Sequence, residues 1–146
     1  MKHKKSDNFE TKSVSSSLVR FAIDFKPEFV SDEVKQIAQL SLFDWFVVSL
    51  AGQTEPVSNI IRGQIKSDGG AEDCTVIGTT QRFPARASAL ANGTTSHALD
   101  YDDTHFAYLG HPSVAIIPAA IAIGEKTNAK PENFWNAVIL GLEIVT

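Results

Sequence analysis

The sequence is poor in cysteine, in net positive charge and in long apolar runs. Its single cysteine, Cys74, excludes an intrachain disulfide and suits a reducing compartment, so we expect a cytoplasmic protein. The net charge of -4 argues against a broad cationic surface for nucleic acid. The longest apolar run, residues 114–123, contains Pro118 and is far shorter than the ~20 residues that a transmembrane helix needs. We therefore expect neither nucleic acid nor a membrane as a partner.

Several catalytic signatures are also missing from the sequence. There is no Gly-rich phosphate loop, no Gly-x-Ser-x-Gly nucleophile elbow and no Cys/His zinc pattern. Cys74 lies in a short β-prone stretch and has no basic neighbour in sequence that would lower its pKa. We therefore interpret Cys74 as a packing residue rather than as a nucleophile.

The N-terminal segment contains the only basic run, residues 1–5, which polar residues follow. A secretory signal would need an apolar stretch there, so this segment does not resemble one. We expect residues 1–15 to form a solvated, disordered lead-in, the alternative being a short tether to lipid or RNA. The remaining residues, 16–146, are expected to form one domain.

Helix signals recur through residues 16–146 and predict an all-α protein with about five helices. Ser31 followed by two acidic residues marks one start, and prolines mark the first turns of the others. Apolar residues then recur at helical spacing. The expected helices cover residues 31–52, 56–68, 84–97, 112–126 and 131 onwards, with a short extended piece at 75–78.

Gly93 is unexpected inside the helix predicted for residues 84–97, which is otherwise rich in small side chains. A glycine there costs about 1 kcal/mol of helix propensity relative to alanine. Either tight packing against a neighbouring backbone or a kink would account for it.

The last residues, 140–146, are still apolar and of helical character, and no capping residue follows them. We therefore expect this chain to be a fragment of a longer protein.

The segment between the third and fourth predicted helices, residues 96–113, is the densest in groups that move protons. It holds three carboxylates and three of the four histidines of the chain. Clustered carboxylates raise one another's pKa, and a histidine exchanges protons near neutral pH. Such groups suit proton transfer at a carbon next to a carboxylate. His111 precedes a helix start, where the N–H groups of Ser113 and Val114 would cradle an anion.

Other roles fit the same residues. Asp102, Asp103 and Thr104 are equally suited to capping a helix or holding a turn. His97 is interpreted as a hydrogen-bonded core histidine rather than as a catalyst, and His105 is as readily solvent-exposed. The carboxylates and histidines also offer ligands to a metal ion, but their spacing matches no hydrolase signature, and we predict no metal.

These residues resemble the MmgE/PrpD family. The resemblance extends over residues 31–146 and is carried by the motifs at 89–93, 97–105 and 111–113, with further matches at 43–44, 76–79, 118–120 and 141–143. The family includes 2-methylcitrate dehydratase, cis-aconitate decarboxylase and an iminodisuccinate epimerase.

The resemblance implies a large helical domain and a smaller α/β lid with the active site between them. Members are usually homodimers that use no metal or organic cofactor. They act on small polycarboxylates by proton transfer next to a carboxylate. This chain would be the N-terminal part of the helical domain, without the lid.

Carried over by position, three residues match the catalytic motif of the family. His111 would act in proton transfer or carboxylate binding, Thr104 would hydrogen-bond the substrate, and Asp100 would orient or polarise it. The candidates for substrate binding are Asp103, His105 and Ser113.

The chain stops before the region where the family places further active-site histidine, lysine and tyrosine residues. We therefore expect the 146-residue chain alone to be inactive. The alternative to an enzyme is a helical remnant or interaction fragment without catalysis of its own.

Overall fold

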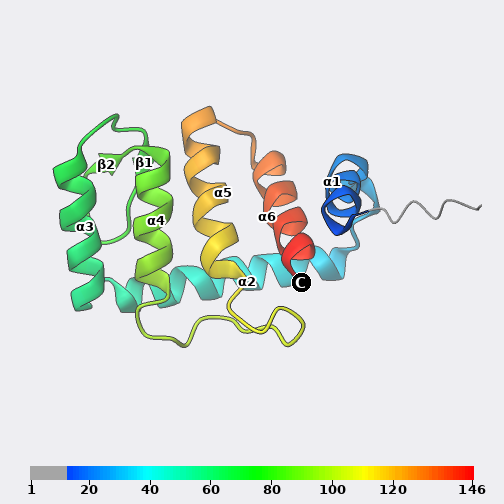
Figure 1. The fold of residues 1–146 in the computed structure, drawn as a ribbon, viewed down its shortest axis with the longest axis horizontal. Coiled ribbons are helices and arrows are strands. Elements are labelled where there is room, and N and C mark those ends of the chain that lie inside the picture. The colour runs from blue at the N-terminus through cyan, green and yellow to red at the C-terminus, as the bar shows by residue number, and fades with distance from the viewer. Residues whose placement is uncertain (1–12) are drawn as a thin grey trace, which may run out of the picture.

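The structure, a computed structural model, describes residues 13–146, which fold into six α-helices, one 3-10 turn and a two-stranded sheet (Figure 1). The elements are α1 (Val14–Asp24), η1 (Pro27–Phe29), α2 (Asp32–Gly52), α3 (Pro56–Asp68), β1 (Cys74–Thr75), β2 (Arg82–Phe83), α4 (Ala85–Ser96), α5 (Ser113–Thr127) and α6 (Pro131–Val145). The all-α prediction is confirmed, and the five predicted helices correspond to α2–α6. None of the helices formed by residues 13–146 is both long and apolar enough to cross a bilayer.

Local signals explain where the helices begin. The Ser31 hydroxyl caps α2 by accepting the Val34 N–H at 3.4 Å. Pro56 and Pro131 occupy the first positions of α3 and α6, where a missing N–H costs no helical hydrogen bond.

The helix α1 is the main departure from prediction. Residues 1–12 of the expected lead-in lie outside the described residues, but its last residues, 14 and 15, belong to α1. The helix forms there because the Ser13 side chain caps it, accepting the Ser16 N–H at 3.2 Å. Leu18, Phe21 and Phe25 follow at helical spacing, and this was the signal for a sixth helix.

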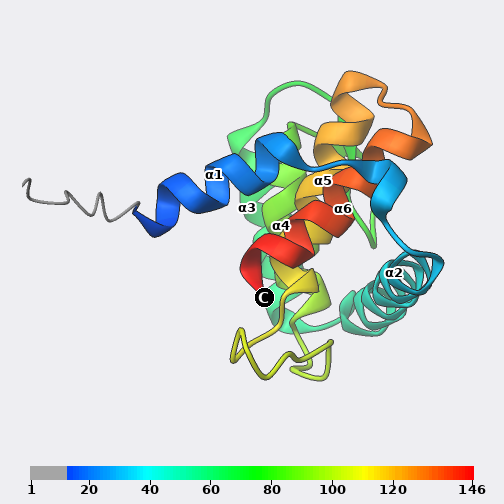
Figure 2. The same ribbon diagram turned by 90° about the vertical axis from the view of Figure 1, so that its right-hand side faces the viewer.

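Helices α3, α4, α5 and α6 stand side by side in chain order across the long helix α2 (Figure 1). Helix α1 packs beside α6 at the end of this row (Figure 2). The core cluster between α2, α5 and α6 consists of Ala38, Trp45, Ile117, Val138 and Ile139. A second cluster, at α3 and α4, consists of Ile65, Val76, Phe83 and Ala91.

The small strands β1 and β2 pair antiparallel near the N-terminal end of α4. Cys74 of β1 is fully buried, and its thiol donates a hydrogen bond to the Ala122 carbonyl at 3.1 Å. Burial raises the pKa of the Cys74 thiol, and the charges of Glu125 and Asp73 raise it further. The packing role predicted for Cys74 is confirmed.

Two glycines let α4 approach its neighbours closely. A β-carbon at Gly52 would collide with the carbonyl oxygen of Thr95, so α2 and α4 touch backbone to backbone. A β-carbon at Gly93 would lie 3.0 Å from the carbonyl oxygen of Val114 in α5. Tight packing therefore accounts for Gly93. It brings the end of α4 and the start of α5 together, and the connecting residues 97–112 carry the candidate site.

Candidate active site

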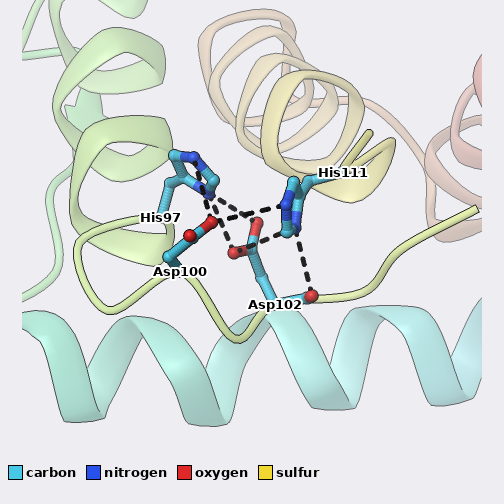
Figure 3. Close-up of side chains that lie close together, drawn as sticks. All are labelled: His97, Asp100, Asp102 and His111. Atoms are coloured by element: carbon cyan, nitrogen blue, oxygen red, sulfur yellow. Dashed lines mark hydrogen bonds and ion pairs between the residues drawn. The ribbon is translucent and has the colours of Figure 1, made fainter. Parts of the chain in front are cut away.

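Four side chains from residues 97–111 converge above α2 (Figure 3). His97 is the C-cap of α4, Asp100 and Asp102 lie in the connecting loop, and His111 lies just before α5. They are the predicted residues Asp100 and His111 together with His97 and Asp102.

Asp102 lies at the centre of this cluster, with a side chain that is 0% exposed. The Nδ1 atom of His97 lies 2.9 Å from Oδ1 and 3.2 Å from Oδ2 of this carboxylate. On the other side, Nδ1 of His111 lies 3.3 Å from the same Oδ1. The two imidazole rings meet edge to face, with centroids 4.7 Å apart. One buried carboxylate is thus shared by two histidines.

The hydrogen bonds indicate which ring nitrogen of His111 carries a proton. Its Nδ1 also lies 3.2 Å from the backbone carbonyl oxygen of Asp102. A carbonyl oxygen only accepts, so Nδ1 of His111 is the donor. Its Nε2 is left to face Asp100, whose Oδ1 lies 3.5 Å away, and Nε2 of His97 lies 3.8 Å from that same oxygen.

Asp100 reaches both rings because its backbone is left-handed, with φ 57°. Aspartate tolerates this region better than most residues, because its short polar side chain forms local hydrogen bonds. A strained conformation at a cluster of titratable groups is typical of functional sites.

Asp103 points away from this cluster and caps α5. Its carboxylate accepts the backbone N–H of Ser113 at 3.2 Å and the Ser113 hydroxyl at 2.5 Å. Ser113 is only 1% exposed. An anion was predicted to bind the free N–H groups at this helix start. The N–H of Ser113 is already used, because it donates to the Asp103 carboxylate. The capping interpretation of Asp103 is confirmed.

Asp44 of α2 approaches the same loop from below. Its Oδ2 is buried and has no hydrogen-bond partner among the described residues. Burial raises the pKa of the Asp44 carboxyl, and the charges of Asp103 and Asp102 raise it further, while the backbone N–H of Asp103 lowers it. Sequence reasoning gave Asp44 no role, although it is the only ionisable residue in the apolar half of α2, at 42–50.

Thr104 and His105 are exposed and stand apart from the cluster. The backbone of His105 closes a small loop, donating its N–H to the Gly110 carbonyl at 3.0 Å and accepting the Leu109 N–H at 2.8 Å. Within residues 13–146, neither side chain makes a hydrogen bond. The solvent-exposed interpretation of His105 is confirmed, and the roles of both residues toward a substrate stay predictions.

The structure brings two of the predicted site residues, Asp100 and His111, together with His97 and Asp102. His97 was expected to be a hydrogen-bonded core histidine. It is hydrogen-bonded, but its side chain is 44% exposed. A capping or turn role was one of the alternatives left open for Asp102, and its side chain lies buried beside the rings of His97 and His111. The signal for both was the close spacing of one histidine and two aspartates at 97, 100 and 102, which a loop can bring together.

The four side chains His97, Asp100, Asp102 and His111 each offer one nitrogen or oxygen atom within 4.8 Å of the others, as a metal site would require. However, tetrahedral ligands about 2.1 Å from a zinc ion lie about 3.4 Å apart. The 2.9 Å between His97 Nδ1 and Asp102 Oδ1 matches a charge-assisted hydrogen bond instead. The geometry favours a hydrogen-bonded network, and we assign no metal to it.

The electrostatic balance of the site is negative. In the part of the chain that the structure describes, the lysine and arginine ion pairs all lie elsewhere: Lys35–Asp32, Arg82–Glu125 and Lys126–Asp73. The only groups of this cluster that become cationic on taking up a proton are therefore the two imidazoles.

Comparison with known proteins places this chain in a family. The sequence model described as the MmgE/PrpD N-terminal domain matches residues 16–146. The chain is also 27% identical, over 133 residues, to the cis-aconitate decarboxylase-like protein oryM of Aspergillus oryzae. That match covers 91% of this chain but 27% of the relative, so the chain spans about a quarter of the relative's length. The chain belongs to the MmgE/PrpD family, as its N-terminal-domain match and its helical fold both indicate.

Proposed function

We propose that this chain supplies the proton-transfer groups of a lyase or epimerase that acts on a small polycarboxylate next to one of its carboxylates. The observation that carries the proposal is the arrangement of His111. Its Nδ1 is held by Asp102, so Nε2 is directed toward the accessible side of the cluster, where Asp100 lies. Family membership and the decarboxylase-like relative support this reaction class.

The chemistry follows from that orientation. Neutral His111 accepts the proton of the substrate carbon at Nε2, and the electron pair of the broken C–H bond delocalises into the adjacent carboxylate. The buried carboxylate of Asp102 stabilises the imidazolium that forms. Loss of hydroxide then completes a dehydration, and return of a proton to the other face completes an epimerisation. In a decarboxylation, carbon dioxide leaves first and the imidazolium protonates the carbanion.

The substrate's charge calls for groups beyond these residues. A polycarboxylate brings at least two negative charges to a site already rich in carboxylates, and the described residues place no lysine or arginine beside it. We therefore propose that cationic groups from further segments or subunits complete the site. The 146-residue chain alone is then inactive.

We further propose that the protein forms a homodimer and works in the cytoplasm. A stripe of exposed apolar side chains on α2 supports a protein contact: Leu40, Phe43, Val47 and Leu50 recur at helical spacing and are each more than two-fifths exposed. The cytoplasmic assignment depends on the single cysteine. Light scattering of the purified protein measures the oligomeric state, and a monomer at micromolar concentration contradicts the dimer.

The test of the reaction class is an NMR assay in deuterated buffer on the full-length product of the gene. Citrate, 2-methylcitrate, cis-aconitate and aspartate-derived diacids are offered in turn, each with and without a chelator. We expect deuterium next to a carboxylate, or product, with at least one of them and unchanged by the chelator. Loss of turnover on chelation would instead favour the metal site.

The second candidate function is an interaction fragment without catalysis. The exposed apolar stripe on α2 and the shortage of cationic groups at the site favour it. A folded full-length protein that exchanges no proton with any of these acids would support this candidate and contradict the enzyme.

A further inference from the structure

We propose that Asp102 is a positioning residue that fixes both His97 and His111 in the Nδ1–H form, which makes His97 a second proton-transfer group beside His111. The proposal rests on the proposed function and adds to it a second base and the residue that orients both. It follows from three features of the cluster.

The first feature is the burial of Asp102. A carboxylate taken out of water needs donors for its oxygens, or its burial is strongly unfavourable. Its side chain is fully buried, and Nδ1 of His97 hydrogen-bonds both of its oxygens. Nδ1 of His111 donates to the backbone carbonyl of Asp102 and lies 3.3 Å from Oδ1 of the carboxylate. Both rings therefore present a proton at Nδ1 to Asp102, His97 to the carboxylate and His111 to the backbone carbonyl.

The second feature is the direction in which the remaining nitrogens point. With both Nδ1 atoms facing Asp102, the Nε2 atoms of the two rings face one oxygen, Oδ1 of Asp100, at 3.8 Å and 3.5 Å. The side chain of His97 is 44% exposed and that of His111 is 22% exposed, so a ligand above the cluster can reach both. Asp44 of α2 lies near the same loop, where the charges of Asp103 and Asp102 act on it.

The third feature is the rigidity of His97. It ends α4, where its backbone N–H donates to the Gly93 carbonyl at 3.2 Å. Its ring contacts both oxygens of Asp102 and meets the edge of the His111 ring. Helix α4 therefore fixes His97, and His97 fixes the plane of the carboxylate that holds His111.

Two such imidazoles let one site remove and deliver a proton. Neutral His111 accepts the proton of the substrate carbon at Nε2, and the C–H electron pair stays on the substrate. For this step His97 has taken up a second proton at Nε2 while its Nδ1–H stays on Asp102, and it gives the Nε2 proton to the leaving oxygen or to the opposite face of the carbon. One ring gains the proton that the other loses, so the charge beside Asp102 is unchanged.

The test of the positioning role needs no substrate. Nitrogen-15 NMR of the histidine-labelled chain reports which ring nitrogen is protonated in each neutral imidazole, and loss of a signal in His97→Gln or His111→Gln assigns it. We expect the Nδ1–H form at both residues in the wild type. In Asp102→Ala, we expect His97, which loses its side-chain acceptors, to convert to the Nε2–H form, and His111 to become a mixture.

Asp102→Asn serves as the second variant if Asp102→Ala does not fold, and the wild-type spectrum alone decides the orientation. His105→Gln is the matched control, because this histidine lies in the same loop and its side chain is exposed. A wild-type spectrum with the Nε2–H form at His111 overturns the positioning role. The same follows if the tautomers of His97 and His111 do not change when the Asp102 carboxylate is removed.

The test of His97 as a second proton-transfer group is kinetic. In the full-length protein, His97→Gln should lower kcat by about 10²–10⁴-fold, the usual contribution of a general acid or base, with KM little changed. A rise in KM with an unchanged kcat would make His97 a binding residue and refute this part. If the proposed reaction class is wrong but the positioning role is right, the wild-type protein will be inactive and its histidines will still show the expected tautomers.

Discussion

Replacing Asp103 with alanine tests whether its carboxylate holds the loop of the site to α5. The variant loses the hydrogen bond from the Ser113 N–H, a helix cap worth about 1 kcal/mol. It also loses the charged hydrogen bond from the buried Ser113 hydroxyl, worth about 1.5–3 kcal/mol. Against these, the charge of Asp103 raises the pKa of Asp44, so its removal relieves some repulsion. We expect a net loss of about 2 kcal/mol.

Thermal and urea unfolding followed by circular dichroism measure this loss. For a domain of this size, 2 kcal/mol lowers Tm by roughly 6–10 °C. Asp103→Asn keeps an oxygen that accepts the Ser113 N–H, and its amide N–H donates to the Ser113 hydroxyl oxygen. It should therefore lose less than half as much stability as Asp103→Ala. Asp68→Ala is the matched control, because this exposed aspartate bonds only Gln64 of its own helix, and it should stay within about 0.5 kcal/mol of wild type. An Asp103→Ala variant as stable as wild type would refute the capping role.

Three further substitutions test the packing and the electrostatics around the site by urea unfolding. Gly52→Ala should destabilise by about 1–3 kcal/mol, since its β-carbon meets the Thr95 carbonyl. Gly63→Ala should stabilise by about 0.5–1 kcal/mol, because Gly63 lies inside α3 with open space around it. Equal effects of the two substitutions would contradict the close α2–α4 contact. Because the folded pKa of Asp44 is raised, wild-type stability falls as pH rises from its unfolded pKa near 4 through the folded value. Asp44→Asn removes that loss, so its stability relative to wild type should increase between pH 4 and pH 7. A stability difference that stays constant across this range would show that the pKa of Asp44 is not raised.

The sequence predicted most of the fold because its helix signals are local. Ser31, Pro56 and Pro131 begin helices for reasons contained within one turn, and apolar spacing extends them. Helix α1 was missed because its first turn, residues 14–17, is mostly serine and resembles a solvated lead-in.

The candidate site was only partly predictable because its geometry depends on contacts distant in sequence. The density of histidine and aspartate located the segment, and the family resemblance selected Asp100 and His111. No periodicity could assign Asp102 to the interior, because its position depends on a left-handed Asp100 and on Asp103 bonding Ser113 across the loop. The approach of Asp44 depends on how α2 packs beneath that loop, which only the tertiary fold determines.

The most direct test of the central claim compares two histidines of one loop in the full-length protein. Deuterium incorporation from heavy water into the accepted polycarboxylate is measured by NMR for His111→Gln and for His105→Gln, with circular dichroism confirming that both are folded. At saturating substrate, we predict that His111→Gln exchanges at least about 10²-fold more slowly than wild type, as expected for loss of a general base. We predict that His105→Gln, a candidate for substrate binding, raises KM but loses far less of the exchange rate. Near-normal exchange by a folded His111→Gln protein would contradict the assignment of His111 as the proton-transfer group.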